Sequence, residues 1–143
     1  MNFFSAEAEK NVKTLTLWAR LVLWCAIILL FSSIPSYDGQ PLDLETIPGV
    51  IKFFCRKLAH MFEYAYLTIF FYRAVERSWP KRNQIYFLCS FAFVILFAAI
   101  DECRQSFIFG RMGSPFDIFV DAVGSLIGSK FLAPHDREEK TNS

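Results

Sequence analysis

The fold of this chain is decided by one stretch, Lys57-Leu58-Ala59-His60-Met61-Phe62-Glu63-Tyr64. The stretch places three ionisable side chains inside a run that is otherwise as apolar as a membrane helix. A charged side chain at the centre of a membrane helix costs about 2.5–3.5 kcal/mol on insertion scales, so such residues indicate a functional site or a buried pairing. Residues 101–105 and 117–128 interrupt apolar sequence in the same way.

The composition around this stretch is that of a membrane protein. Of the 143 residues, 54% are hydrophobic and 17% are aromatic, which is too apolar for an ordinary soluble domain, and the length suits one domain. The 15 basic and 14 acidic residues give a formal net charge of +1, so no basic excess indicates a nucleic-acid partner. Membrane lipids are the first partner that the composition predicts.

Four apolar segments predict transmembrane helices, because a hydrocarbon core about 30 Å thick requires about 20 helical residues. A cleavable signal peptide is the alternative for the first segment, but residues 32–35 lack the small-residue cleavage pattern. Ser114 followed by Pro115 is typical of a helix start. The sequence therefore predicts an all-α membrane protein, a four-transmembrane-helix bundle within residues 15–133, between an N-terminal lead-in (1–14) and a charged tail (134–143). The predicted spans are about 15–34, 53–74, 83–100 and 115–132.

The basic residues predict the orientation of these spans. Ten of the fifteen Lys and Arg residues fall on the side of the two termini, and five fall on the other side. The positive-inside rule then places both termini in the cytoplasm of a multi-pass protein of the cell (inner) membrane. On this prediction Lys57 opens the second helix, Asp101 closes the third and Asp117 opens the fourth, all at the extracytoplasmic face.

The polar residues of the second span share one helix face. Lys57, His60, Glu63 and Tyr64 fall within about 120° of arc, so all four can point into a bundle. His60 and Glu63 could act as an oriented base, serve as two metal ligands, or pair with each other. The alternative is structural: Lys57 lies in the membrane interface, while His60 and Glu63 bond to neighbouring helices.

The third span ends in a second polar group. Asp101 and Gln105 are four residues apart and are predicted to form an inward pair, whereas Glu102 is turned about 100° away. An acid at a helix C-terminus opposes the helix dipole, which favours a specific partner, and Lys57 and Arg111 are the candidates.

The fourth span carries two aspartates and two glycines on one face. Asp117, Asp121, Gly124 and Gly128 lie within about 60° of arc. Glycines four residues apart allow another helix to approach closely, either within the chain or in a homo-oligomer. The aspartates would then be carried into the bundle.

Acidic residues outnumber basic residues among the inward-facing polar residues of the last three spans. Together these residues could bind a cation, share protons, or bind a cationic or hydroxyl-rich ligand. No metal or other cofactor is expected, since one His with scattered carboxylates has no tight ligand spacing. If two carboxylates from different helices lie within about 6 Å of His60, the motifs form one composite site. The predicted cluster contains Lys57, His60, Glu63, Tyr64, Asp101, Glu102, Gln105, Arg111, Asp117 and Asp121.

The ordered motifs resemble those of the VanZ-like family of bacterial integral membrane proteins over about residues 15–133. One departure is Asp121, where Asn is common in the family. The family is named for a protein associated with low-level resistance to the glycopeptide teicoplanin, and the resemblance implies a role at the cell envelope without an established reaction. The matching motifs are Lys57-x-x-His60-x-x-Glu63-Tyr64, Asp101-Glu102-x-x-Gln105-x-Phe107, Arg111 and Asp117-x-x-x-Asp121-x-x-Gly124-x-x-x-Gly128.

Three functions follow from these residues. The first is a non-enzymatic envelope protein whose outward-facing cluster binds a ligand, a lipid headgroup or a partner. The second is an intramembrane enzyme with His60 as general base, with or without a metal, acting on a lipid-linked or cell-wall-related substrate. The third is a proton- or ion-coupled transporter, which requires titratable residues near the middle of the membrane.

Overall fold

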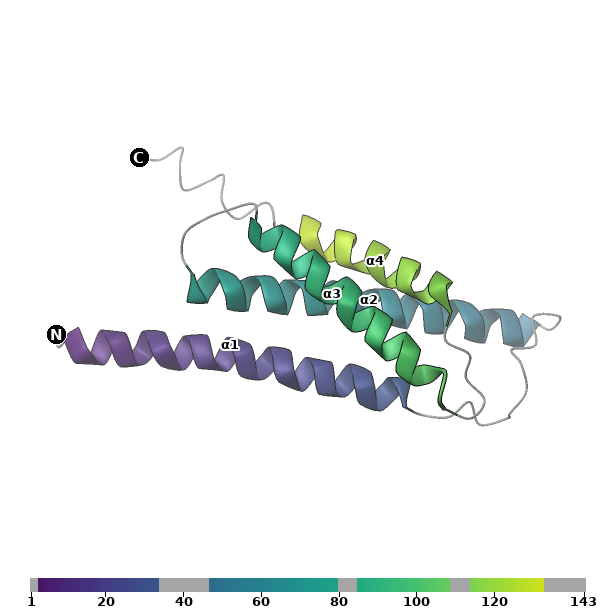
Figure 1. Cartoon of the computed structure of the whole chain (residues 1–143), viewed down its shortest axis with the longest axis horizontal. Helices are drawn as coiled ribbons and strands as arrows, with labels where there is room; N and C mark the ends of the chain where they lie inside the picture. The colour runs from purple at the N-terminus through teal and green to yellow at the C-terminus, as the bar shows by residue number, and fades with distance from the viewer. Residues whose placement is uncertain (1–2, 34–46, 80–84, 109–113, 133–143) are drawn as a thin grey trace.

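The structure is a computed structural model that describes residues 3–33, 47–79, 85–108 and 114–132. Within these residues α-helix is the only regular secondary structure, as the sequence predicts. The helices alternate in direction, so the ends of α1 and α3 and the starts of α2 and α4 lie at one end of the bundle (Figure 1). The four helices are α1 (Phe3–Ser32), α2 (Ile47–Ser78), α3 (Ile85–Gln105) and α4 (Pro115–Lys130).

Three helices differ in length from the predicted spans. α1 begins at Phe3, so most of the predicted lead-in is helical, and a Lys13–Glu9 ion pair (Nζ to Oε1, 2.5 Å) lies along its polar first turns. α2 begins at Ile47, before the predicted start at residue 53, because a proline such as Pro48 is tolerated in the first turn of a helix. α3 continues past Asp101 to Gln105. The prediction that Asp101 closes this helix is therefore wrong.

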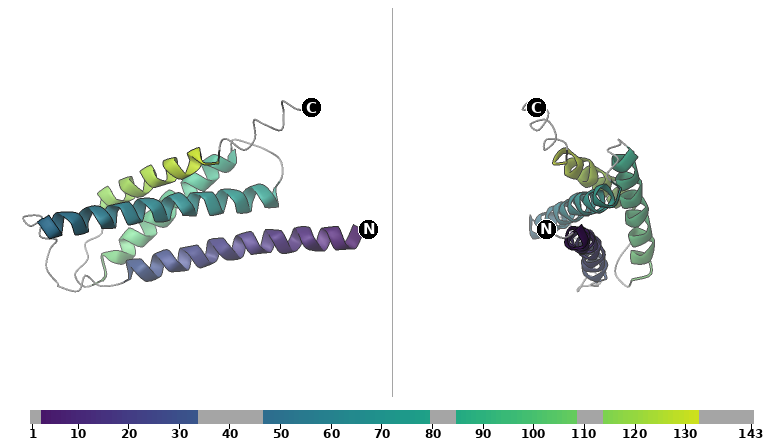
Figure 2. Two further views of the ribbon diagram at one scale, coloured as in Figure 1. Left: turned by 180° about the vertical axis from the view of Figure 1, so that it is seen from behind. Right: turned by 90° about the vertical axis from the view of Figure 1, so that its left-hand side faces the viewer.

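α2 is the central helix of the bundle. It contacts each of the other three, with α1 and α4 on separate sides and α3 crossing obliquely (Figure 2). α1 and α4 do not contact each other within the described residues. Side chains on different faces of α2 therefore meet different neighbours.

α4 packs closely on α2 through its glycines. A Cβ atom added to Gly124 would collide with the backbone carbonyl of Met61, and one added to Gly128 would collide with that of Ala65. The close approach also joins Thr68 Oγ1 to Ser125 Oγ at 2.8 Å. The glycine face is thus occupied by α2 of the same chain, and a homo-oligomer through it would have to displace α2.

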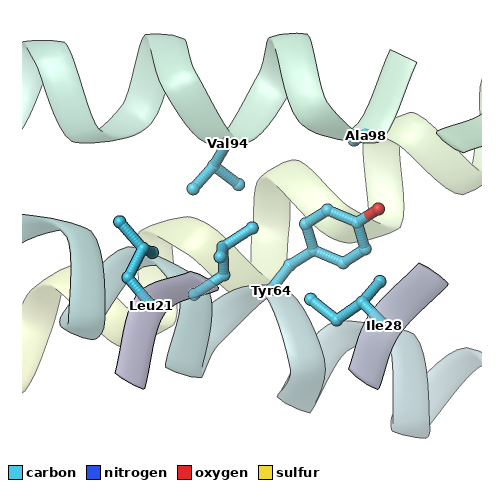
Figure 3. Close-up of a cluster of buried hydrophobic side chains, with 6 residues drawn as sticks. Leu21, Ile28, Tyr64, Val94 and Ala98 are labelled. Carbon is cyan, nitrogen blue, oxygen red and sulfur yellow. The ribbon is translucent and has the colours of Figure 1, made fainter. Parts of the chain in front are cut away.

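A small apolar core joins α1, α2 and α3 beside this contact. Leu21 and Ile28 of α1 pack with Tyr64 of α2 and with Val94 and Ala98 of α3 (Figure 3). These side chains are buried, and they fix the face that each helix turns inward.

Two indole groups hold α1 against α2. Trp18 Nε1 donates a hydrogen bond to Ser78 Oγ, and Trp24 Nε1 donates one to the backbone carbonyl of Glu63, both at 2.9 Å. The second bond places α1 beside the polar stretch of α2.

Two of the four helices are long and apolar enough to cross a membrane. They comprise Glu7–Ser32, with 26 residues, and α3, with 21. Large apolar side chains stay exposed along them, including Leu15 at 70% and Leu96 at 62%, as expected for lipid contact. α4 has 16 residues and is about 24 Å long, which is shorter than a typical hydrocarbon core.

Candidate functional site

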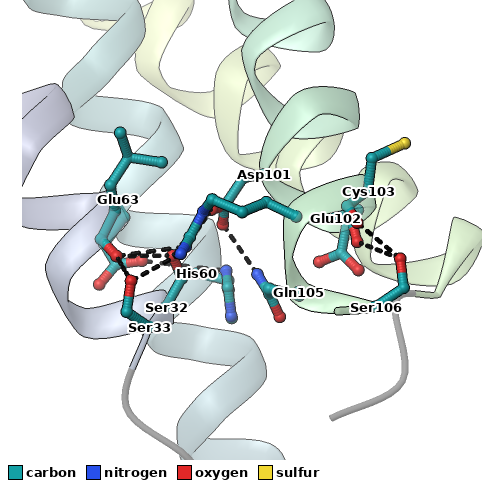
Figure 4. A network of polar contacts seen from close by, with 11 residues as sticks. Ser32, Ser33, His60, Glu63, Asp101, Glu102, Cys103, Gln105 and Ser106 are labelled. Carbon is teal, nitrogen blue, oxygen red and sulfur yellow. Dashed lines mark hydrogen bonds and ion pairs between the residues drawn. The ribbon is translucent and has the colours of Figure 1, made fainter. Parts of the chain in front are cut away.

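The polar residues of α2, α3 and α4 gather towards the end of the bundle where α1 and α3 end and α4 begins. Figure 4 shows His60 and Glu63 of α2 beside Asp101 and Gln105 of α3. Helix geometry explains this gathering, because each polar residue lies on the face that its helix turns towards a neighbour. The sequence motifs are therefore brought together in space.

His60 lies between two carboxylates from two helices. It is 7% exposed, and its Nδ1 lies 3.9 Å from Glu63 Oε2 and 3.8 Å from Asp121 Oδ1. Both distances are well within the range of about 6 Å over which charges influence each other's protonation. Tyr64 stacks nearly parallel to the imidazole, with ring centroids 6.4 Å apart. One composite site therefore includes α2 and α4.

Asp121 is the most unusual member of this site. Its side chain is 1% exposed, and within the described residues neither carboxylate oxygen accepts a hydrogen bond. It is the seventh of the sixteen residues of α4, so the site extends to the middle of that helix. Burying an unpaired carboxylate is costly, which favours a proton or a bound positive group there.

One turn nearer the end of the bundle, Lys57 and Asp117 form an ion pair between α2 and α4. Both side chains are largely buried, at 16% and 15% exposed. The Lys57 ammonium also lies 5.2 Å from the centre of the Phe53 ring and 5.6 Å from that of Phe116, within cation–π range. Lys57 is well inside α2 rather than at its start, so that sequence prediction is wrong.

Both carboxylate oxygens of Asp101 of α3 accept hydrogen bonds, in contrast to those of Asp121. Its Oδ1 accepts hydrogen bonds from Ser32 Oγ at 2.8 Å and from Arg104 Nη2 at 2.7 Å (Figure 4). Its Oδ2 accepts one from Gln105 Nε2 at 2.8 Å, so the predicted Asp101–Gln105 pair forms. The ion-pair partner of Asp101 is Arg104.

The two partners that the sequence indicated for Asp101 do not account for this pairing. Lys57 pairs with Asp117 of α4. Arg111 lies outside the described residues.

Glu102 is buried as well, against the prediction that it turns away from the interior. It is 5% exposed, and its Oε2 accepts a hydrogen bond from the Ser114 backbone N–H at 2.8 Å. Ser114 is the N-cap of α4, and its Oγ accepts from the Phe116 N–H at 3.2 Å. Glu102 is buried because α3 is covered on two sides, by α1 and α2 at Asp101 and by the start of α4 at Glu102.

Comparison with known proteins agrees with these motifs. Residues 3–133 match the family described as VanZ/LLP1. The chain belongs to the VanZ/LLP1 family. The resemblance drawn from the motifs is thereby confirmed, and the match extends to the start of α1, beyond the predicted limit at residue 15. No curated protein and no solved structure matches the chain.

Sequence reasoning missed a second polar contact in this VanZ/LLP1 protein, at the end of α1. Arg104 Nη1 donates to Ser33 Oγ at 2.6 Å, and Nη2 donates to the Leu29 carbonyl at 3.2 Å and also contacts Ser32 Oγ. The spacing of three residues between Asp101 and Arg104 is a recognisable helical pair and could have indicated their contact. Nothing in the sequence distinguishes Ser32 and Ser33 from other small polar residues.

The described residues offer few options for a metal. Across the described ranges, no group of three His, Cys, Asp or Glu side chains is arranged to hold a metal ion. What this part of the VanZ/LLP1 chain does provide is a buried carboxylate, Asp121, that accepts no hydrogen bond from the described residues, together with a neighbouring imidazole and a second carboxylate. Such a set suits the recognition of a hydrogen-bond donor or the transfer of a proton.

Proposed function

We propose that this VanZ/LLP1 protein is a multi-pass protein of the bacterial cell membrane whose polar cluster binds a polar ligand of the cell envelope. The observation that carries the proposal is the Asp121 carboxylate, which is buried beside His60 and accepts no hydrogen bond from the described residues. A buried acceptor without a donor is costly in a closed protein and is satisfied when a ligand supplies the donor.

In this proposal all four helices cross the membrane and both termini lie in the cytoplasm. The alternating direction of the helices and the excess of basic residues on the side of the termini support this arrangement. The short α4 is accommodated by local thinning of the bilayer. The composite site then faces the extracytoplasmic side.

The envelope role rests on the family. Its namesake is associated with low-level resistance to the glycopeptide teicoplanin, and an outward-facing site is suited to a lipid headgroup, a lipid-linked precursor or another cell-wall ligand. We therefore propose envelope maintenance, with glycopeptide tolerance as its measurable consequence.

The test is a chromosomal deletion complemented by wild-type protein, Glu63→Gln or Asp121→Asn. We expect the deletion to lower the inhibitory concentration of teicoplanin several-fold, and both variants to fail to restore it at normal membrane levels. Glu9→Gln, at an exposed position far from the site, is the matched control and should complement fully. Full complementation by both site variants would contradict a functional role for the cluster.

A second candidate is acid/base catalysis on a lipid-linked or cell-wall-related substrate. The observation that favours it is the position of His60 Nδ1 between Glu63 and Asp121, since carboxylates orient an imidazole that acts as a general base. Purified protein in lipid nanodiscs with a lipid-linked precursor separates the two functions. An enzyme converts the precursor and loses turnover in His60→Gln, whereas a binding protein leaves the precursor intact.

A further inference from the structure

We propose that Asp121 binds a primary ammonium group of the ligand. The inference rests on the proposed function and specifies the ligand's chemistry. The Asp121 side chain is 1% exposed, and within the described ranges neither of its two oxygens accepts a hydrogen bond. A primary ammonium group carries three N–H donors and one positive charge, which are the two properties that this carboxylate requires.

The distribution of charge favours a cation over a neutral ligand. Lys57 is paired with Asp117, and Arg104 is paired with Asp101, so neither charge is available to the inner part of the site. Within the described residues, neither Lys57 nor Arg104 pairs with Asp121, and the nearest imidazole, that of His60, lies 3.8 Å from its Oδ1. A ligand with a single positive charge would balance the Asp121 carboxylate.

The same two helices already hold an ammonium group one turn away. Lys57 Nζ is bound between α2 and α4 by the Asp117 carboxylate, with the rings of Phe53 and Phe116 beside it. The equivalent position one turn deeper has Asp121 on α4 and the stacked pair His60 and Tyr64 on α2. This deeper position repeats the carboxylate and the aromatic surroundings but lacks a lysine of its own.

A metal ion is a poorer fit than an ammonium group. Metal sites in proteins require several ligating side chains, and the described residues contain no group of three that is suitably arranged. An ammonium group is satisfied by the two oxygens of Asp121 together with one further acceptor, such as Glu63.

Two sources could supply the ammonium group. One is the headgroup of a membrane lipid, because α2 and α4 both expose large apolar side chains suited to lipid contact, such as Phe62 at 59% and Phe119 at 63%. The other is a soluble amine from the extracytoplasmic side. The chemistry at Asp121 is the same for both, so the experiment must distinguish them.

The test compares headgroups that differ only in methylation at nitrogen. The wild-type protein is purified in detergent, and its thermal unfolding midpoint is followed while phosphatidylethanolamine, its N-monomethyl and N,N-dimethyl forms, or phosphatidylcholine is added. We expect stabilisation to decrease along this series as N–H donors are lost. The soluble part of the test adds ethanolamine, with tetramethylammonium as the cation without N–H donors. If ethanolamine stabilises the protein at concentrations comparable to those of the lipid, the ligand is a soluble amine.

Asp121→Asn removes the charge while keeping the shape of the side chain. We expect it to weaken binding of the amine about tenfold or more, the effect of losing a charge-assisted hydrogen bond, and to abolish the preference for ethanolamine over choline headgroups. The control variant Glu9→Gln should keep both the amine binding and the preference for ethanolamine headgroups. If Asp121→Asn fails to fold, the methylation series on the wild-type protein still decides the question.

The outcomes separate this inference from the proposed function. Equal stabilisation by all four lipids and no effect of ethanolamine would overturn the ammonium inference. If an uncharged hydroxyl-rich lipid then stabilised the wild-type protein but not Asp121→Asn, the proposed ligand site would stand with a different ligand. If both Asp121→Asn and Glu63→Gln also complemented the deletion fully, the proposed function would fail together with the ammonium inference.

Discussion

Two aspartates that are equally buried have opposite surroundings. Asp101 and Asp121 are each 1% exposed. Asp101 accepts hydrogen bonds from a serine, an arginine and a glutamine, whereas Asp121 accepts none from the described residues. A buried carboxylate that accepts hydrogen bonds stabilises the fold, whereas one that accepts none has a different role. Stability measurements can separate these two roles.

We expect Asp101→Asn to destabilise the protein and Asp121→Asn not to. Loss of the Asp101 charge leaves Arg104 without its ion pair, at a cost of about 3 kcal/mol, the lower end of the range for breaking a buried pair because Arg104 is 34% exposed. Asp121→Asn removes a buried charge without a donor and should leave the unfolding midpoint unchanged or raise it. The unfolding midpoints of both variants are measured in detergent without added amines. Equal destabilisation by the two changes would contradict the different roles of Asp101 and Asp121.

The Lys57–Asp117 pair should behave as one unit. Lys57→Met leaves a largely buried Asp117 without its cation, so we expect destabilisation, and a second change, Asp117→Asn, should restore much of the loss. A double-mutant cycle should give a coupling free energy of about 1 kcal/mol or more. Additive effects of the two changes would show that the pair does not join α2 to α4.

At the scale of the helices, the contact between α2 and α4 positions the site. His60 and Asp121 face each other because Gly124 and Gly128 let the two helices approach until a Cβ atom no longer fits. Glu102 fixes the start of α4 from α3, through the backbone N–H of its N-cap. α4 is therefore positioned from two neighbouring helices.

We expect Gly124→Val to disrupt both the packing and the site. The new side chain would collide with the Met61 carbonyl, and overpacking of this kind costs about 1–3 kcal/mol, with a backbone collision at the upper end. The unfolding midpoint should fall, and the amine response of the site should weaken. Ala92→Val, at an exposed position on α3, introduces the same valine side chain and should change neither the midpoint nor the amine response. A normal midpoint for Gly124→Val would contradict the close packing.

At the scale of the whole molecule, two of the five basic residues on the predicted outer side are neutralised within the bundle. Lys57 pairs with Asp117, and Arg104 pairs with Asp101. The positive-inside rule counts Lys and Arg residues rather than net charge, so the proposed orientation rests on the ten basic residues on the side of the termini against five on the other side.

Reporter fusions test that orientation. We expect green fluorescent protein fused after Ser143 to fluoresce and alkaline phosphatase at the same position to be inactive, because the C-terminus is proposed to be cytoplasmic. Alkaline phosphatase inserted after Gln40 should be active. The reverse pattern would place the site at the cytoplasmic face and remove the argument for an extracytoplasmic ligand.

The sequence by itself determined the features that depend on neighbours along the chain. Apolar segments, the Ser114–Pro115 helix start and the spacing of four between Gly124 and Gly128 all follow from helical periodicity and capping, so they indicated the helices and their inward faces. The same periodicity placed His60 and Glu63 on one face. Family membership followed from the order of these motifs.

Only the tertiary structure decided which polar groups meet. Arg104 rather than Lys57 pairs with Asp101, Ser32 at the end of α1 completes that network, and Glu102 is buried because α3 is covered on two sides. The contacts of this network join residues up to 75 positions apart, such as Arg104 and Leu29. Their formation depends on where α3 crosses the other helices, and the crossing is set by packing of all four helices together rather than by local sequence.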